Sequence, residues 1–260
     1  MPQEKDPGRI RRMFAEIAPR YDFLNHFLSL NLDRSWRQRT VGSLKLPTRA
    51  RVLDTCTGTA DLAVELARAL RPLGGMVIGC DFTPEMLRIG EAKRRKALLE
   101  NLRLVVADSL ALPFPAGFFD AVTVAFGIRN VCDPGAGLQE ILRVLKPGGT
   151  AAILEFSPPE RGVLRAGFEV YFRKVLPVIG RWVSGSTAYA YLPNSVVQFP
   201  TRGRFAQFLQ ECGFEDVRIS RLTFGVAVLH LARKPSAALN PAQVLAEVVA
   251  PMEERKGFGE

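Results

Sequence analysis

One short segment, RVLDTCTGTAD at residues 51–61, constrains the fold of this chain more than any other. Val52 and Leu53 are typical of the end of a buried strand, and Asp54 lies at its carboxyl edge. A run of small residues follows, and Asp61 opens a predicted helix. The apolar residues of that helix recur at helical spacing: Leu62, Leu66, Ala67 and Leu70. Strand, tight turn and helix in this order form the nucleotide-binding unit of doubly wound α/β sheets, because N–H groups at the helix start are directed at the ligand.

The turn itself differs from the dinucleotide fingerprint. It has one glycine, Gly58, where that fingerprint has three, and its acid, Asp54, precedes the turn. A carboxylate at this point would repel a pyrophosphate, whereas it suits a sulfonium and a free amino group. The segment therefore favours S-adenosylmethionine (SAM) over NAD. Asp54, Gly58 and Asp61 are the candidate cofactor contacts of this unit, and the alternative for Asp54 is that it structures the turn.

The rest of the chain alternates between apolar strand-like runs and helical patterns. Strands alternating with helices predict an α/β fold with a doubly wound, mostly parallel sheet. Two further strands near the end of the chain complete a predicted sheet of seven. The predicted strands after the first span 76–81, 102–106, 119–125, 150–156, 218–222 and 226–232. A tight turn is predicted at 146–149 and a further helical region at 196–212.

We expect a single domain over residues 1–234, followed by a helical or loose tail at 235–260. Residues 13–45 form a predicted N-terminal cap, and between 13 and 39 apolar positions recur at helical spacing, where Pro19 would interrupt the helix or begin a second one. Because this segment precedes the first strand, we expect N-terminal helices that cap the carboxyl edge of the sheet or lie at its border. Residues 1–12 are polar, and we expect them to be frayed.

A helical insertion is predicted after the fifth strand, over residues 160–200. Between 165 and 185 its apolar residues recur at helical spacing, with basic residues around them. One interpretation is a lid helix packed on the core. The other is an amphipathic basic surface that lies in the bilayer interface and admits a lipid-tailed substrate. The two interpretations are compatible.

Acidic residues end the second strand and follow the third. Asp81 lies one βαβ step after the first turn, where an acid accepts hydrogen bonds from two ribose hydroxyls. The alternative is that Asp81 serves only as a negative charge at the start of the next helix. Phe82 is placed to lie against an adenine ring. Asp108 is placed to accept from the adenine amino group, with the N–H of Ser109 as a donor.

Composition sets limits on compartment and partners. The chain has 260 residues, 47% hydrophobic, and a formal net charge of +9, which favours an acidic partner such as nucleic acid or anionic lipid headgroups. Four cysteines without CxxC spacing and only two histidines favour a reducing compartment and argue against a metal site. The chain has no apolar signal core and no run of about 18 apolar residues. We therefore expect a cytoplasmic protein without a membrane span.

Several motifs together resemble a known family. VLDTCTGTAD, GCDFTPEML, ADSLALPFP, FDAVTVAFGIRNV and LRVLKPGG are similar to the class I SAM-dependent methyltransferases. APRYDFLN, AFGIRNV, LPNSVVQFP and GVAVLH resemble, within them, the demethylmenaquinone and ubiquinone biosynthesis C-methyltransferases (MenG/UbiE). The resemblance covers residues 13–234. It implies cofactor contacts at Thr59, Asp81 and the Asp108–Ser109 pair. A family serine at the end of the fourth strand is Ala125 here, which leaves only a backbone contact.

The resemblance implies methyl transfer to a ring carbon of a lipophilic prenylated quinol. A phenol proton must leave, and a positive charge would stabilise the resulting oxyanion. Arg129, just after the fourth strand, is the first candidate because its guanidinium stays charged. His230 and His26 are the candidate general bases. Asn130 and Tyr21 are candidates for orienting the ring oxygens.

Other questions stay open at this point. The ring is a naphthoquinol or a benzoquinol, and the resemblance of the cysteine-containing first turn to the menaquinone branch of the family favours demethylmenaquinol. Contact with an anionic membrane surface and homodimer formation are both compatible with the sequence.

Two other classes of function were compared with this one. A nucleic-acid methyltransferase would suit the charge, but amine methylation typically uses an (N/D)PP(Y/F) loop where this chain has AFGIRN. SPPE at 157–160 resembles that loop weakly, and no RNA-binding module is present. We therefore expect no nucleic-acid partner. The third class is a non-catalytic relative that binds SAM or the membrane.

Overall fold

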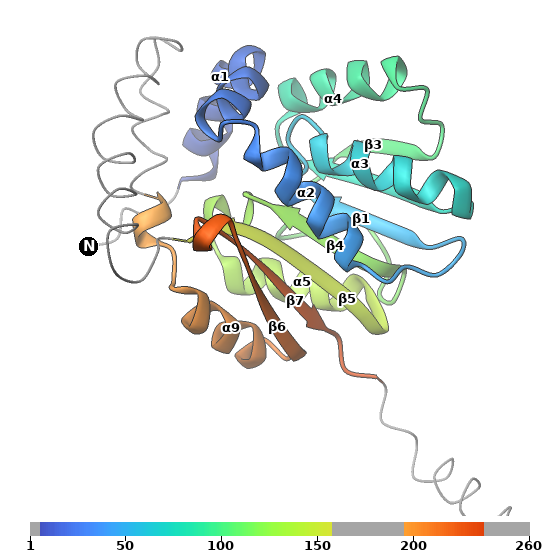
Figure 1. Ribbon diagram of the computed structural model, residues 1–260, viewed down its shortest axis with the longest axis vertical. Helices are drawn as coiled ribbons and strands as arrows, with labels where there is room; N and C mark the ends of the chain where they lie inside the picture. The colour runs from blue at the N-terminus through green and yellow to red at the C-terminus, as the bar shows by residue number, and fades with distance from the viewer. Residues whose placement is uncertain (1–5, 158–194, 237–260) are drawn as a thin grey trace, which may run out of the picture.

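The computed structural model describes residues 6–157 and 195–236, and its centre is one seven-stranded sheet. The strands are β1 (Arg51–Thr55), β2 (Met76–Asp81), β3 (Leu102–Val106), β4 (Phe119–Ala125), β5 (Leu145–Phe156), β6 (Glu215–Leu222) and β7 (Ala227–Arg233). Their order across the sheet is β3-β2-β1-β4-β5-β7-β6 (Figure 1). The first five run parallel, and β7 is antiparallel to both β5 and β6. The predicted doubly wound, mostly parallel sheet is confirmed.

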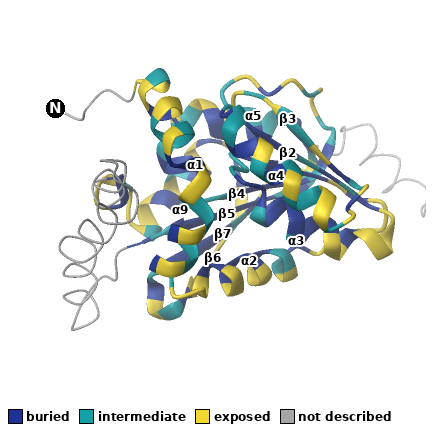
Figure 2. Ribbon diagram, turned by 90° about the horizontal axis from the view of Figure 1, so that it is seen from above, coloured by how far each residue is buried: buried dark blue, intermediate teal, exposed yellow. Residues whose placement is uncertain are grey.

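Helices cover both faces of the sheet, so the strands are buried between two layers (Figure 2). Val52 and Leu53 are fully buried on opposite faces of β1, since successive strand residues point to opposite sides. Val52 packs with Trp36 and Leu66, and Leu53 packs in the layer that contains Phe205. One layer holds α2 (Leu32–Ser43), α3 (Asp61–Leu70) and α4 (Pro84–Lys96), and the other holds α5 (Pro134–Val144) and α9 (Arg202–Glu211).

The N-terminal helix α1 (Pro7–Leu28) is longer than expected. The prediction that residues 1–12 are frayed is wrong from Pro7 onward, because Asp6 caps the helix and Ile10 is buried. Pro19 does not interrupt it either, although an internal proline costs about 3 kcal/mol. Apolar residues are buried on both sides of Pro19, which offsets that cost. The chain instead turns at Leu30 and Asn31, which have φ of 53° and 60°, and continues into α2.

Two other boundaries differ from the prediction. The expected tight turn at 146–149 lies within β5, where the pairing with β4 shifts register and Gly148 has φ of 72°. The helical region expected from Val196 to Cys212 is divided in two: residues 195–198 are helical, and α9 begins at Arg202 after a break. Both differences lie at element ends, where local sequence signals are weakest.

Part of the predicted architecture lies outside the described residues. This applies to the amphipathic helix at 165–185, to most of the insertion at 160–200 and to the tail after 236. Among the described helices, none is both long and apolar enough to span a bilayer.

Candidate functional site

A cavity opens at the carboxyl edge of the parallel strands, beside the point where the strand order reverses between β1 and β4. Ligands of doubly wound sheets bind at this position because the loops diverge there. The cavity gathers candidate residues from five separate segments. They are Tyr21, Gly58, Asp81, Phe82, Asp108, Ser109, Ala125 and Asn130.

Apolar side chains that were not predicted as site residues complete the wall. Their signal in the sequence was the spacing of Ile10, Phe14 and Tyr21, which places them on one face of α1. Helical spacing alone does not say which surface such a face covers. The additional lining residues include Pro7, Ile10, Phe14, Cys56, Met86, Leu110, Phe126, Val131 and Cys132.

The first turn adopts the backbone of a glycine-rich loop without its outer glycines. Cys56, Gly58 and Ala60 have φ of 52°, 56° and 65°, the left-handed region that favours glycine. Holding Cys56 and Ala60 there costs about 1–2 kcal/mol each. Gly127 makes the turn close-packed, because a Cβ on it would lie 2.4 Å from the Cβ of Cys56. The turn thus keeps the small-residue surface that a close-fitting ligand needs.

Asp54 is not among the residues that line this cavity, and its contacts are those of a residue that structures the turn. It is 1% exposed, and its carboxylate accepts hydrogen bonds from the hydroxyls of Thr57 at 2.5 Å and Thr123 at 2.6 Å. Burial raises its pKa from 3.8 to about 6, against the lowering effect of the two hydroxyls. Through these two hydrogen bonds, Asp54 links the turn to β4.

The raised pKa of Asp54 makes stability depend on pH. The folded state holds the Asp54 proton up to about pH 6, whereas the unfolded chain releases it near 3.8. Stability should therefore fall as pH rises from about 4 to about 6, by roughly 3 kcal/mol in total. Asp54→Asn removes this titration and keeps the size of the side chain. Urea unfolding of both proteins at several pH values measures the difference, and identical pH profiles would contradict the prediction.

Asp81 lies at the cavity wall and joins the turn to α4. Its Oδ2 accepts the Gly58 N–H at 2.9 Å, and its Oδ1 accepts the Thr83 N–H at 2.9 Å. The carboxyl group is buried, and this burial raises its pKa while the backbone donors oppose the rise. Asp81 thus does serve at a helix start, as the alternative interpretation held. A carboxylate oxygen has two lone pairs, so each can still accept a ligand hydroxyl.

Thr59 and Asp61, two further candidate cofactor contacts, are not among the residues that line the cavity. The Thr59 hydroxyl donates to Asp22 Oδ1 of α1 at 2.5 Å. Asp61, at the start of α3, accepts from Lys93 Nζ at 2.5 Å and lies 3.5 Å from Arg37 Nη2. Both residues therefore hold the turn to the helices around it. The sequence contains one indication of the role of Asp22: it directly follows Tyr21, which is a candidate site residue.

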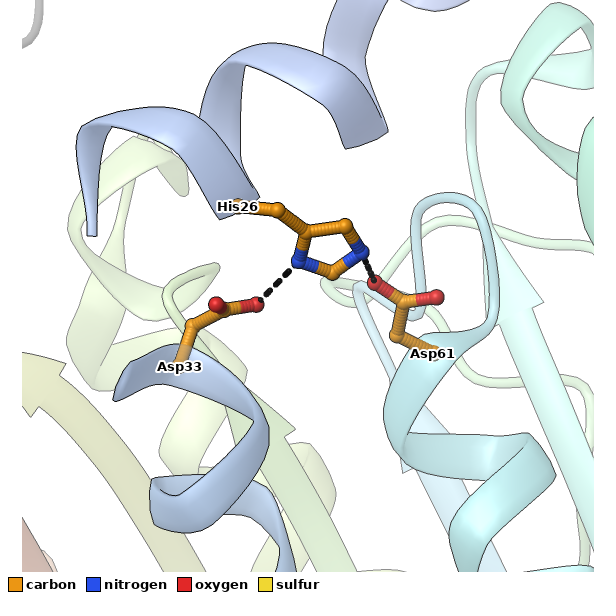
Figure 3. Close-up of side chains that lie close together, drawn as sticks. All are labelled: His26, Asp33 and Asp61. Carbon is orange, nitrogen blue, oxygen red and sulfur yellow. Dashed lines mark hydrogen bonds and ion pairs between the residues drawn. The ribbon is translucent and has the colours of Figure 1, made fainter. Parts of the chain in front are cut away.

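His26 belongs to the same network and is not in the cavity. Its Nδ1 lies 2.8 Å from Asp33 Oδ2, and its Nε2 lies 3.8 Å from Asp61 Oδ2 (Figure 3). Arg37 also contacts Asp33, and Lys93 lies 2.7 Å from Asp22. The network ties α1, α2, α3 and α4 together beside the turn.

The same three side chains could in principle hold a metal ion, because ligand atoms of His26, Asp33 and Asp61 lie within 4.8 Å of one another. The donor set does not fit one. Arg37 already contacts both carboxylates, and Lys93 contacts Asp61. A divalent cation would have to bind beside the positive charges of Arg37 and Lys93, which repel it. Asp33 and Asp61 are therefore ion-pair partners within the network.

Arg129 is buried beside the cavity, in an ion pair that the sequence analysis missed. One guanidinium nitrogen lies 2.8 Å from Glu155 Oε2 and donates to the Phe126 carbonyl at 2.6 Å. Burial raises the pKa of Glu155, and the Arg129 charge opposes the rise. Burial likewise raises the pKa of Tyr21, with the Arg129 charge as the main opposing effect. Glu155 is the penultimate residue of β5, the strand that pairs with β4, and Arg129 lies in the loop after β4. This adjacency could have identified the pair.

His230 is not brought to the cavity. It lies in β7, where it packs edge-on against Phe205 with ring centroids 5.1 Å apart, and its Nε2 lies 3.0 Å from the Arg202 carbonyl. Burial lowers its pKa and keeps the ring neutral near pH 7. Both of its neighbours belong to α9, so His230 packs a helix on the sheet.

Comparison with known proteins identifies the family. The model of the ubiE/COQ5 methyltransferase family matches residues 2–234. The UbiE ubiquinone/menaquinone biosynthesis C-methyltransferase of Geobacter sp. strain M21 is 47% identical over 227 residues, which cover 87% of this chain and 96% of the relative. The demethylmenaquinone methyltransferase of Thermus thermophilus is 47% identical over 224 residues, which cover 86% of this chain and all of the relative.

Solved structures share the fold at low identity. A SAM-dependent methyltransferase of Thermotoga maritima, described as a possible histamine N-methyltransferase, has a TM-score of 0.61 and 20% identity over 86% of this chain and 99% of its own. The cyclase SpnF has a TM-score of 0.61 and 19% identity over 78% of this chain and 82% of its own. A methyltransferase and a cyclase match equally well, so these likenesses support the fold alone. By its matched family model and its relatives, the chain belongs to the ubiE/COQ5 methyltransferase family.

Proposed function

We propose that this protein transfers a methyl group from SAM to a ring carbon of a prenylated quinol, and that its substrate is demethylmenaquinol. The supporting observation is the composition of one cavity. Asp81 and Asp108 line it together with Tyr21 and Asn130, and apolar side chains such as Phe14 form the rest of the wall. Such a cavity suits a polar nucleoside next to an apolar ring. The Thermus relative, matched over its full length, carries the name of the demethylmenaquinone reaction.

The residues present fit SAM. Asp81 offers a buried carboxylate for the ribose hydroxyls, and Asp108 with Ser109 lies where the adenine edge would be held. Phe82 offers a ring face, and Ala125 offers only its backbone. When bound, SAM supplies the methyl group as an electrophilic carbon attached to a sulfonium.

An unpaired polar atom supports a ligand on the acceptor side. Among the described residues, Asn130 Oδ1 is buried without a hydrogen-bond partner, while its Nδ2 donates to the Phe126 carbonyl at 3.3 Å. Buried polar atoms are rarely left unpaired. We assign Asn130 Oδ1 as the acceptor for a ring hydroxyl of the quinol.

Tyr21 and Arg129 act on the other ring oxygen. Burial raises the pKa of Tyr21, so its phenol keeps its proton and donates a hydrogen bond. The Arg129 charge acts on Tyr21, and the same positive charge favours the ionised form of the quinol oxygen. Its ion pair with Glu155 fixes the guanidinium in place. The apolar side chains of α1 exclude water from the reacting atoms.

Two broader features complete the proposal. The domain at 1–234 carries the activity. Because a prenylated quinol resides in the bilayer, the protein works as a peripheral protein at an anionic membrane surface, which its net charge of +9 favours.

The direct test is a methyl-transfer assay. The protein is incubated with isotopically labelled SAM and, in separate reactions, with demethylmenaquinol, a benzoquinol of matched prenyl length, and ribosomal RNA. We expect label in menaquinol, confirmed by a mass gain of one methyl group. Preferred labelling of the benzoquinol would correct the ring assignment. Label in RNA alone, or in none of the three, would overturn the proposal.

A further inference from the structure

The end of α1 and the start of α2 carry an exposed apolar patch, which we call the α1 patch: Phe23, Phe27, Leu30 and Leu32. Their side chains are 61%, 50%, 79% and 38% exposed. Phe23 and Phe27 stack on each other, with ring centroids 5.8 Å apart and planes 11° apart. Contiguous exposed apolar side chains of this kind mark interaction sites, whereas isolated ones are common.

The α1 patch lies next to the face of α1 that the charge network holds against the neighbouring helices. Phe23 and Phe27 are four residues apart and share one face, whereas Asp22 and His26 share the adjacent face and belong to the charge network. The network ties that face to α2, α3 and α4. The α1 patch is therefore exposed to solvent, and the ion pairs of the adjacent face hold its helix in place.

A basic groove adjoins the α1 patch, and His26, next to Phe27, contributes to its wall. Five cationic side chains line it against only two acids, Asp61 and Glu65. Arg37, Lys93 and Arg68 form ion pairs. Arg34 and Lys96 have no ion-pair partner in the described part of the chain. These two provide uncompensated positive charge close to the α1 patch.

We propose that the α1 patch and the basic groove together dock the protein on an anionic bilayer surface. Phe23, Phe27 and Leu30 enter the boundary between headgroups and acyl chains, and Arg34 and Lys96 contact the anionic headgroups. Aromatic and aliphatic side chains beside basic ones form the usual interfacial anchor. The docking role rests on the proposed function, because a prenylated quinol must be taken from the bilayer.

The docking also has a consequence for the site. The same helix supplies Phe14 and Tyr21 to the cavity. A bilayer bound at the α1 patch would therefore lie against the helix that forms one cavity wall. A second copy of the chain is a weaker occupant, because a symmetric contact would bring Arg34 and Lys96 of both copies close together.

Vesicle co-sedimentation tests the proposal. Phosphatidylcholine vesicles with and without phosphatidylglycerol are mixed with the wild type, with Phe23→Ser/Phe27→Ser, and with Arg34→Glu/Lys96→Glu. The matched control is Ile219→Ser, which changes an exposed apolar residue of β6, 41% exposed, outside the α1 patch. We expect each double variant to weaken binding to the anionic vesicles by about tenfold or more. We expect the control to bind as the wild type does.

Two further measurements separate the outcomes. Methylation of a water-soluble short-chain quinol should be unchanged in the double variants, while methylation of a long-chain quinol embedded in vesicles should fall. If the wild type does not methylate the short-chain quinol, the proposed function fails, whereas vesicle binding still tests the docking. Wild-type binding by the Phe23→Ser/Phe27→Ser variant would overturn the docking. Size-exclusion chromatography that shows a dimer lost in that variant would also overturn it, in favour of a second copy.

Discussion

Replacing Arg129 with alanine should lower the free energy of unfolding by about 3–5 kcal/mol, because it leaves the Glu155 carboxylate buried without its charge partner. Glu155 is 1% exposed, and the Arg129 guanidinium lies 2.8 Å from it. The same change removes the positive charge that acts on Tyr21. We therefore expect turnover to fall more than about tenfold, since removing a single charge-stabilising donor typically costs that much or more. Urea unfolding and steady-state kinetics below the unfolding transition measure the two effects.

The double variant Arg129→Leu/Glu155→Leu separates structure from catalysis. Removing both charges avoids the unpaired carboxylate, so we expect most of the stability to return. Turnover should remain low, because the positive charge beside Tyr21 is still missing. If turnover returned together with stability, the role of Arg129 in catalysis would be rejected, and the ion pair would be purely structural.

Replacing Asp81 with asparagine should weaken SAM binding by roughly tenfold to a hundredfold. Asparagine keeps one acceptor oxygen, so one of the two ribose hydroxyls would lose its charge-assisted hydrogen bond, which is worth about 1.5–3 kcal/mol. The amide would also turn a donor toward the N–H of Gly58 or of Thr83, because both oxygens of Asp81 now accept backbone hydrogen bonds. Titration calorimetry with SAM gives the dissociation constant directly.

Asp54→Asn is the matched control for this measurement. It makes the same chemical change at another buried acid next to the same turn. Asp54, however, is hydrogen-bonded to Thr57 and Thr123 and does not line the cavity. We expect it to change SAM affinity far less than Asp81→Asn does. Equal losses in both variants would mean that the turn geometry, and not a contact with the ligand, explains the effect at Asp81.

The strands were predictable because buried parallel strands have continuous apolar runs with clear ends. β2, β3 and β4 begin and end at the predicted residues. The gathering of Asp81, Asp108 and Ala125 at one cavity was predictable for a related reason: carboxyl ends of parallel strands share one edge. The left-handed backbone at Cys56 and Ala60 could not be foreseen, because local sequence disfavours it there.

The sequence by itself determined the fold class, the family and the edge of the sheet at which the site lies. These properties depend on apolar periodicity, chain order and motif identity, all of which are local or linear features. Only the tertiary structure decided that Asp54 points into the protein, that Thr59 and Asp61 hold the cap helices, and that His230 packs against α9. The direction and partner of a polar side chain depend on groups distant in the sequence, and no local pattern records which of them folding brings within hydrogen-bond distance.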